Sequence, residues 1–181
     1  MNIDLIAFCL FYIVVLFPRW RKRELFFHTI CYIYLVSVFM LTLSPCIMSL
    51  RSIFSHHYQP MLLEPFRDIL SGYAYADIQI ILNIILFIPF GFLVSKVKQM
   101  GKLKVVFYSF VLSLCIELIQ PLLSVYRYSD ITDIICNTLG GLIGCLLFGY
   151  IKRWVWTHLI LHNIHNYLFL VLFQLLDQDI Q

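Results

Sequence analysis

The chain has 181 residues, a length that would suit one soluble domain, but its composition excludes that class. Hydrophobic residues make up 61% and charged residues only 13%, whereas about a quarter of the residues in a typical soluble protein are charged. The net charge of +3 is small, and we expect membrane lipids and no nucleic acid as partners.

Apolar segments long enough to cross a membrane recur along the chain. A bilayer core about 30 Å thick requires about 20 apolar residues in a helix. Hydropathy predicts about six such spans. They are 3–17, 27–48, 78–95, 103–123, 132–150 and 154–176. The predicted fold class is therefore all-α, a polytopic transmembrane helix bundle, with the last segment either crossing the membrane or lying in its interface.

The spans divide the chain into four regions. We expect two N-terminal transmembrane helices in 1–50, an extracellular loop in 51–77, a core of three transmembrane helices in 78–150, and a C-terminal helix in 151–181. The first apolar run resembles a signal peptide, but nothing basic precedes it and no small-residue cleavage site follows it. We therefore interpret it as a retained helix.

Basic residues on alternate connections predict the orientation. Ten of the 13 lysines and arginines follow the first, third and fifth spans. The exceptions are Arg51, Arg67 and Arg127. Because basic residues stay on the cytoplasmic side, the N-terminus and the 51–77 loop are predicted to be extracellular, in a multi-pass protein of the cell membrane.

Cysteine and histidine spacing gives no support for a metal or cofactor site. The six cysteines occur singly, with no CxxC pair. His158, His162 and His165 are spaced as one helix face and could act as metal ligands, but no carboxylate or cysteine lies near them. A polar face toward the bundle or the headgroups is the simpler interpretation.

Polar residues on two of the spans share one depth in the membrane. Glu117 and Gln120 are spaced i, i+3 on the fourth span and so lie on one face. Asp130, Asp133 and Asn137 form a similar stripe where the fifth span begins. At 1.5 Å per residue, both stripes reach about 10 Å inward from the outer surface.

Two further residues complete the predicted site. Asn83 lies about one turn inside the outer end of the third span, and Arg127 lies in the short outer connection before the fifth. The inner halves of these helices carry almost no polar residues. We therefore predict a ligand-binding site in the outer third of the membrane, formed by Asn83, Glu117, Gln120, Arg127, Asp130, Asp133 and Asn137.

Intramembrane carboxylates favour a functional site over simple packing. An ionised carboxylate deep in a spanning helix costs about 2.5–3.5 kcal/mol on insertion scales, so such groups face a partner or a wet cavity. Arg127 could pair with either of the deepest acids, Glu117 and Asp133. The alternative is polar residues that only hold helices together, but an interhelical hydrogen bond contributes only about 0.6 kcal/mol on average.

Glycine and proline positions predict how the helices pack. Gly140, Gly141 and Gly144 form a small-residue face on the fifth span, suited to close helix approach. Pro89, followed by Gly91, interrupts the hydrogen-bond ladder of the third span and is expected to kink it.

Three motifs resemble the VanZ-like family, named for an accessory protein of glycopeptide resistance clusters that raises tolerance of teicoplanin. They are NIILFIPFGFL from Asn83, ELIQ from Glu117 and RYSDITDIICNTLGG from Arg127, and the resemblance covers about 78–150. It implies that this chain's counterparts of the family's polar and kink positions are Asn83, Pro89, Glu117, Gln120, Arg127, Asp130, Asp133 and Asn137. In the outer loop, members often have asparagine three residues before the proline of a Pro-Phe pair, whereas here Leu62 precedes Pro65 and Phe66. The loop of this chain is therefore not expected to make all the contacts that it makes in those members.

Three functions remain open. The first is a non-enzymatic envelope protein that binds an envelope precursor or a lipoglycopeptide and contributes to teicoplanin-type resistance. The second is a membrane enzyme for an envelope lipid or lipid-linked sugar, with Glu117 and Asp133 as candidate catalytic acid and base. The third is a transporter, which the apolar inner halves of the helices disfavour. The sequence does not indicate an oligomeric state.

Overall fold

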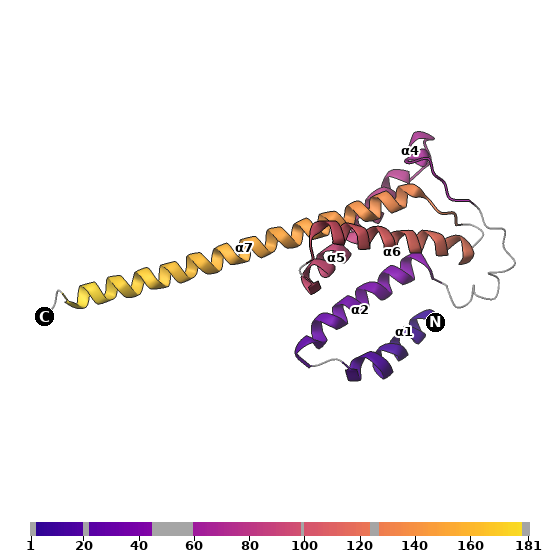
Figure 1. Cartoon of the computed structure of the whole chain (residues 1–181). Coiled ribbons are helices and arrows are strands. Elements are labelled where there is room, and N and C mark those ends of the chain that lie inside the picture. The colour runs from indigo at the N-terminus through magenta and orange to yellow at the C-terminus, as the bar shows by residue number, and fades with distance from the viewer. Residues whose placement is uncertain (1–2, 20–21, 45–59, 99, 124–126, 179–181) are drawn as a thin grey trace. The chain divides into compact units, whose positions relative to one another are not determined.

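The computed structural model describes residues 3–19, 22–44, 60–98, 100–123 and 127–178. Its helices, coloured along the chain in Figure 1, are α1 (Ile3–Phe11), α2 (Lys22–Thr42), α4 (Arg67–Leu70), α5 (Ala76–Lys98), α6 (Lys102–Leu123) and α7 (Ile131–Gln178). The predicted all-α fold is confirmed. Four helices, α2, α5, α6 and α7, are long and apolar enough to cross a membrane.

The first predicted span is helical but irregular. α1 continues into a π-helical turn at Tyr12–Leu16 and a 3-10 turn at Phe17–Arg19, so it is not among the four long spanning helices. It is held to α2 by two hydroxyl contacts. The Tyr32 hydroxyl donates to the Phe8 carbonyl at 2.7 Å, and the hydroxyls of Tyr12 and Thr29 lie 2.7 Å apart.

The chain forms two compact units, Met1–Cys145 and Leu146–Gln181, which we describe separately. The second unit is the later part of α7, and its side chains up to Ile160 are largely exposed. α7 is helical through Lys152 and Arg153, so the spans expected at 132–150 and 154–176 lie on one helix. Lysine and arginine are good helix formers, and no proline separates the two segments, so the local sequence contains no stop signal.

The core of the first unit lies between α2, α5 and α6. Phe87 of α5 is fully buried at its centre, in a cluster with Val38 of α2, Leu43 just after α2, and Ile116 and Leu123 of α6. This cluster packs the three helices against one another.

Glycines bring α5 and α7 into backbone contact, which confirms the predicted small-residue face. A Cβ atom at Gly140 would lie 2.2 Å from the Ile84 carbonyl oxygen, and one at Gly144 would lie 1.9 Å from that of Ile88. Gly91 of α5 faces Gly141 in the same way. Any larger side chain at these positions would hold the two backbones apart. Glycine therefore permits the close packing by which membrane helices associate.

Pro89 lies inside α5, where it removes one backbone donor from the helix. The Tyr34 hydroxyl of α2 donates to the carbonyl of Leu86 at 2.8 Å, next to the interrupted position. The carbonyl that loses its donor at Pro89 is that of Ile85, so the Tyr34 bond lies one residue away and links α2 to α5 beside the interruption.

Candidate functional site

A polar pocket opens at the end of the first unit where α2 and α6 terminate and α7 begins. Its volume is about 590 Å³, within the range of about 300–1,000 Å³ that is typical of small-molecule sites. Hereafter the polar pocket means this cavity. Its lining residues are Leu41, Thr42, Asp68, Gln79, Leu82, Asn83, Ile85, Leu86, Gln120, Arg127, Tyr128, Asp130 and Asp133.

Five of the seven residues predicted for the site line this cavity. They are Asn83, Gln120, Arg127, Asp130 and Asp133. Glu117 and Asn137 do not line it and are buried, with 1% and 3% of their surfaces exposed. Helical spacing predicts which residues share a helix face, but it does not distinguish residues that line a cavity from residues that support it.

Asn83 and Asp133 connect α5 to α7 in the wall of the polar pocket. The Asn83 side-chain amide donates to Oδ1 of Asp133 at 2.5 Å. Both side chains are half-buried and line the pocket, so the Asp133 carboxylate is part of the pocket wall and is held in place by Asn83. A hydrogen bond to a carboxylate is stronger than one between neutral groups.

Asp130 caps the start of α7. Its Oδ1 accepts the backbone N–H of Thr132 at 2.8 Å, the second residue of the helix, as expected of an N-cap aspartate. Its own backbone N–H donates to Oε2 of Glu117 at 3.0 Å. Asp130 is thus oriented by both its side chain and its main chain.

Glu117 supports the connection before α7 from beneath. Besides the bond to Asp130, its backbone carbonyl accepts the Ser129 hydroxyl at 2.5 Å. Both Glu117 and Ser129 are fully buried. Glu117 therefore positions residues 129–130 by two hydrogen bonds, and its carboxylate is not presented to a ligand in the polar pocket.

Arg127 forms no ion pair with an acid among the residues that the structure describes, whereas the sequence suggested a pair with Glu117 or Asp133. Its guanidinium donates to the backbone carbonyl of Thr42, the last residue of α2. The final carbonyls of a helix lack intrahelical donors and carry partial negative charge, which makes them good partners for a cation. The arginine joins the pocket wall to the end of α2.

Asn137 lies below the pocket, between α7 and α6. Its amide donates to the Ser113 hydroxyl at 2.8 Å, while its Oδ1 atom is buried without a hydrogen-bond partner. Ser109 and Ser113 are both fully buried on α6. These residues extend the polar contact between the helices inward as hydroxyl and amide groups, without further charges.

The segment 60–75 is attached to the start of α7 and contributes Asp68 to the polar pocket. The Leu62 backbone N–H donates to the Ser129 carbonyl at 2.8 Å, and the Leu62 carbonyl accepts the N–H of Ile131 at 3.0 Å. The backbone N–H of Phe66 donates to the Thr132 hydroxyl at 2.9 Å. Both contacts of Leu62 use its main-chain atoms. A leucine in place of asparagine therefore does not prevent them.

Asp68 and Tyr128 add a polar contact at the pocket rim. The Tyr128 hydroxyl donates to Oδ2 of Asp68 at 3.1 Å. Burial raises the pKa of the Tyr128 hydroxyl, and the bond to Asp68 raises this pKa further. Asp68 and Tyr128, together with Thr42 and Gln79, are the polar lining residues that were not predicted for the site.

The polar pocket is acidic. Asp68, Asp130 and Asp133 line it, and Arg127 is its only cationic lining residue among those the structure describes. Such a wall accepts hydrogen bonds and favours ligands with hydroxyl, amide or ammonium groups. Within the described ranges, no group of three or more His, Cys, Asp or Glu side chains is arranged to hold a metal ion.

Comparison with known proteins gives two matches. A family profile described as VanZ/LLP1 matches residues 27–153. A curated relative, Protein VanZ of Enterococcus faecium, is 36% identical over 118 residues, which cover 65% of this chain and 70% of that protein. No solved structure matches. The matched region contains α5, α6, the start of α7 and every lining residue of the polar pocket.

Proposed function

This chain belongs to the VanZ/LLP1 family, and we propose that it binds an envelope component or a lipoglycopeptide at the outer leaflet and contributes to teicoplanin-type resistance. The observation that carries the proposal is the polar pocket, in which Asn83, Asp130 and Asp133 are fixed by hydrogen bonds before a ligand arrives. A site whose polar groups are already oriented loses less freedom on binding.

The outward position of the pocket rests on the charge distribution. Lys96, Lys102 and Lys104 lie at the ends of α5 and α6 far from the pocket, as expected for the cytoplasmic side. We propose that the pocket and segment 60–75 are therefore extracellular. A single cysteine introduced for Tyr73, which is exposed, should react with a membrane-impermeant maleimide on intact cells. Labelling only after the cells are opened would contradict this orientation.

Ligand chemistry follows from the wall of the pocket. Its carboxylates suit amine, amide and hydroxyl groups, which both lipid-linked envelope precursors and glycopeptides carry. The lining also contains Leu41, Leu82 and Ile85, so a ligand meets an apolar surface beside the polar one. This combination suits a molecule anchored in the outer leaflet by a lipid tail.

The enzyme alternative has weaker support. A general acid and a general base must both reach the substrate. Of the two candidate carboxylates, Asp133 lines the polar pocket, whereas Glu117 is 1% exposed and bonded to the backbone of Asp130. Binding without a chemical step is therefore the function that we favour.

The test is antibiotic susceptibility of a sensitive Gram-positive strain that expresses the protein at matched membrane levels. We expect the wild type to raise the inhibitory concentration of teicoplanin and to leave that of vancomycin unchanged. Asp133→Asn should abolish the protection because it removes the pocket carboxylate that the bond from Asn83 holds in place. Asp77→Asn is the matched control, since Asp77 is exposed on α5 and does not line the pocket.

Two outcomes would count against the proposal. Protection that survives Asp133→Asn would remove the polar pocket from the mechanism. No protection by the wild type would mean that the role of the relative does not extend to this chain, and turnover of an envelope lipid by the purified protein would then be tested.

A further inference from the structure

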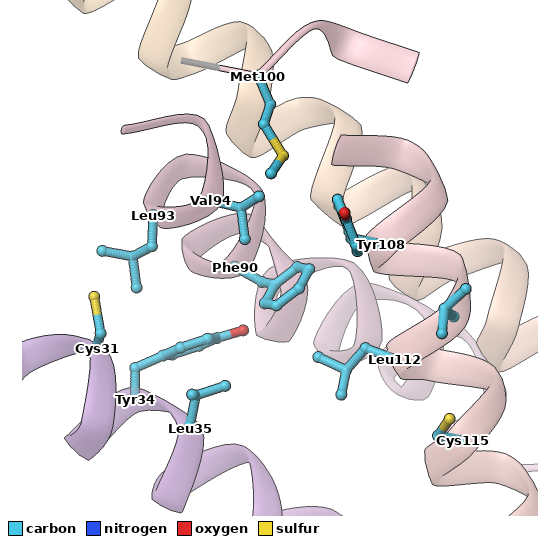
Figure 2. Close-up of a pocket in the computed structure, with 11 residues that line it drawn as sticks. Cys31, Tyr34, Leu35, Phe90, Leu93, Val94, Met100, Tyr108, Leu112 and Cys115 are labelled. Carbon is cyan, nitrogen blue, oxygen red and sulfur yellow. The ribbon is translucent and has the colours of Figure 1, made fainter. Parts of the chain in front are cut away.

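A second cavity, which we call the apolar groove, lies between α2, α5 and α6 (Figure 2). Its volume is about 520 Å³, and its lining includes Tyr34, Phe90, Val94, Met100, Leu112 and Cys115. The groove lies against the middle of α2 and α6 and the later part of α5, and it shares no residue with the polar pocket. It is therefore a separate feature of the first unit.

The walls of the groove suit a hydrocarbon chain. Most of its lining residues carry no hydrogen-bonding side chain. The Tyr34 hydroxyl, which points into this region in Figure 2, is already engaged with the Leu86 carbonyl at 2.8 Å. Filling such a groove with a polar ligand would leave the polar groups of that ligand unpaired, which is costly.

A cation lies beside one end of the groove. The Lys96 ammonium is 4.2 Å from the centre of the Phe27 ring, one helical turn from the groove residue Cys31, and it interacts electrostatically with the Cys31 thiol. Among the side chains that the structure describes, Lys96 forms no ion pair with a carboxylate. Its charge is thus available to a ligand anion.

Further lysines lie at the same end of the helices. Met100, in the connection between α5 and α6, lines the groove, and Lys102 follows it as the first residue of α6. Lys104, one turn along, is exposed. Basic clusters beside a cleft between membrane helices are typical of sites for anionic lipid headgroups.

We propose that the apolar groove holds an acyl chain of an anionic phospholipid whose phosphate lies against Lys96 and Lys102. The apolar walls account for the chain, and lysines that form no ion pair with any described carboxylate account for the sign of the headgroup. This site is independent of the ligand proposed for the polar pocket, so either proposal can fail without the other.

Native mass spectrometry of the detergent-purified protein tests the charge selection. We expect phosphatidylglycerol to bind more tightly than phosphatidylcholine with the same acyl chains. Each of Lys96→Gln and Lys102→Gln should weaken phosphatidylglycerol binding about fivefold and leave phosphatidylcholine unchanged. Lys152→Gln, an exposed lysine in the second unit, is the matched control and should change neither. Equal binding of the two lipids by the wild type would overturn the proposal.

A photoreactive group in the acyl chain of phosphatidylglycerol tests the location without altering the protein. Crosslinks should fall on groove residues such as Val94 and Leu112, and Val94→Trp, which fills the groove, should reduce them. Crosslinks elsewhere on the helices would overturn the assignment.

Discussion

The Asn83 side chain donates to Asp133 at 2.5 Å across 50 positions of sequence, and this bond joins α5 to α7 inside the wall of the polar pocket. It orients Asp133, whose carboxylate lines the pocket and lies within a helix that is long and apolar enough to cross a membrane. The pair therefore couples the stability of the first unit to the geometry of its candidate site.

Replacing Asn83 with alanine should lower the free energy of unfolding by about 1.5–3 kcal/mol, the usual contribution of a hydrogen bond to a charged group. The measurement is the thermal unfolding midpoint in detergent. Asp133→Asn and the double variant complete a double-mutant cycle. Additive losses would show that the two side chains do not interact energetically.

Glu117 should tolerate replacement by glutamine better than by leucine. Glutamine keeps an oxygen that can accept the Asp130 N–H, whereas leucine leaves this donor without a partner at a cost of about 1–3 kcal/mol. The unfolding midpoints of the two variants, compared with that of Ser129→Ala, provide the check. Equal loss in both variants would mean that the bond to Asp130 is unimportant.

Gly144→Ala should disrupt the packing of α5 against α7. The new Cβ would lie 1.9 Å from the Ile88 carbonyl oxygen, so the helices must separate, and overpacking of this kind costs about 1–3 kcal/mol. Gly149→Ala is the matched control on the same helix, because a Cβ there meets nothing within 4 Å. It should be neutral or slightly stabilising, since alanine is the better helix former. Similar elution profiles and midpoints for both variants would contradict the close packing.

Tyr128→Phe should change how stability depends on alkaline pH. The Tyr128 pKa is raised above its usual value of about 10, so the neutral phenol favours the folded state, and this contribution is lost as the pH rises through the folded-state pKa. Below pH 10 the variant should be less stable by at most about 1 kcal/mol. Above pH 10 the difference in unfolding midpoint between the variant and the wild type should become smaller, when both proteins are measured over the same pH series. Curves that stay parallel would exclude a role for this hydroxyl.

Membrane helices and their polar stripes could be predicted from sequence because both depend on local patterns. Periodicity placed Glu117 beside Gln120 and Asp133 beside Asp130, and the structure brings these residues to one end of the first unit. Membership of the family followed from the same motifs and is confirmed.

The remaining features depend on partners that a residue pattern does not encode. The acceptor of Arg127 is the backbone carbonyl of Thr42, which any residue could provide. The continuity of α7 through Lys152 was missed because hydropathy treats a basic pair as a boundary, while helix propensity does not. Glu117 was predicted to face the ligand because spacing gives the face of a helix but not its depth beneath a neighbouring segment.

The attachment of Leu62 has a consequence for how this site can diversify. Because Leu62 is paired with Ser129 and Ile131 through its backbone alone, its side chain is not needed to hold the segment in place. Substitutions at this position can therefore accumulate while the backbone attachment of the segment to residues 129–131 is preserved. In such an architecture the side chains beside the site are free to vary, and the path of the main chain that carries Asp68 to the pocket is kept.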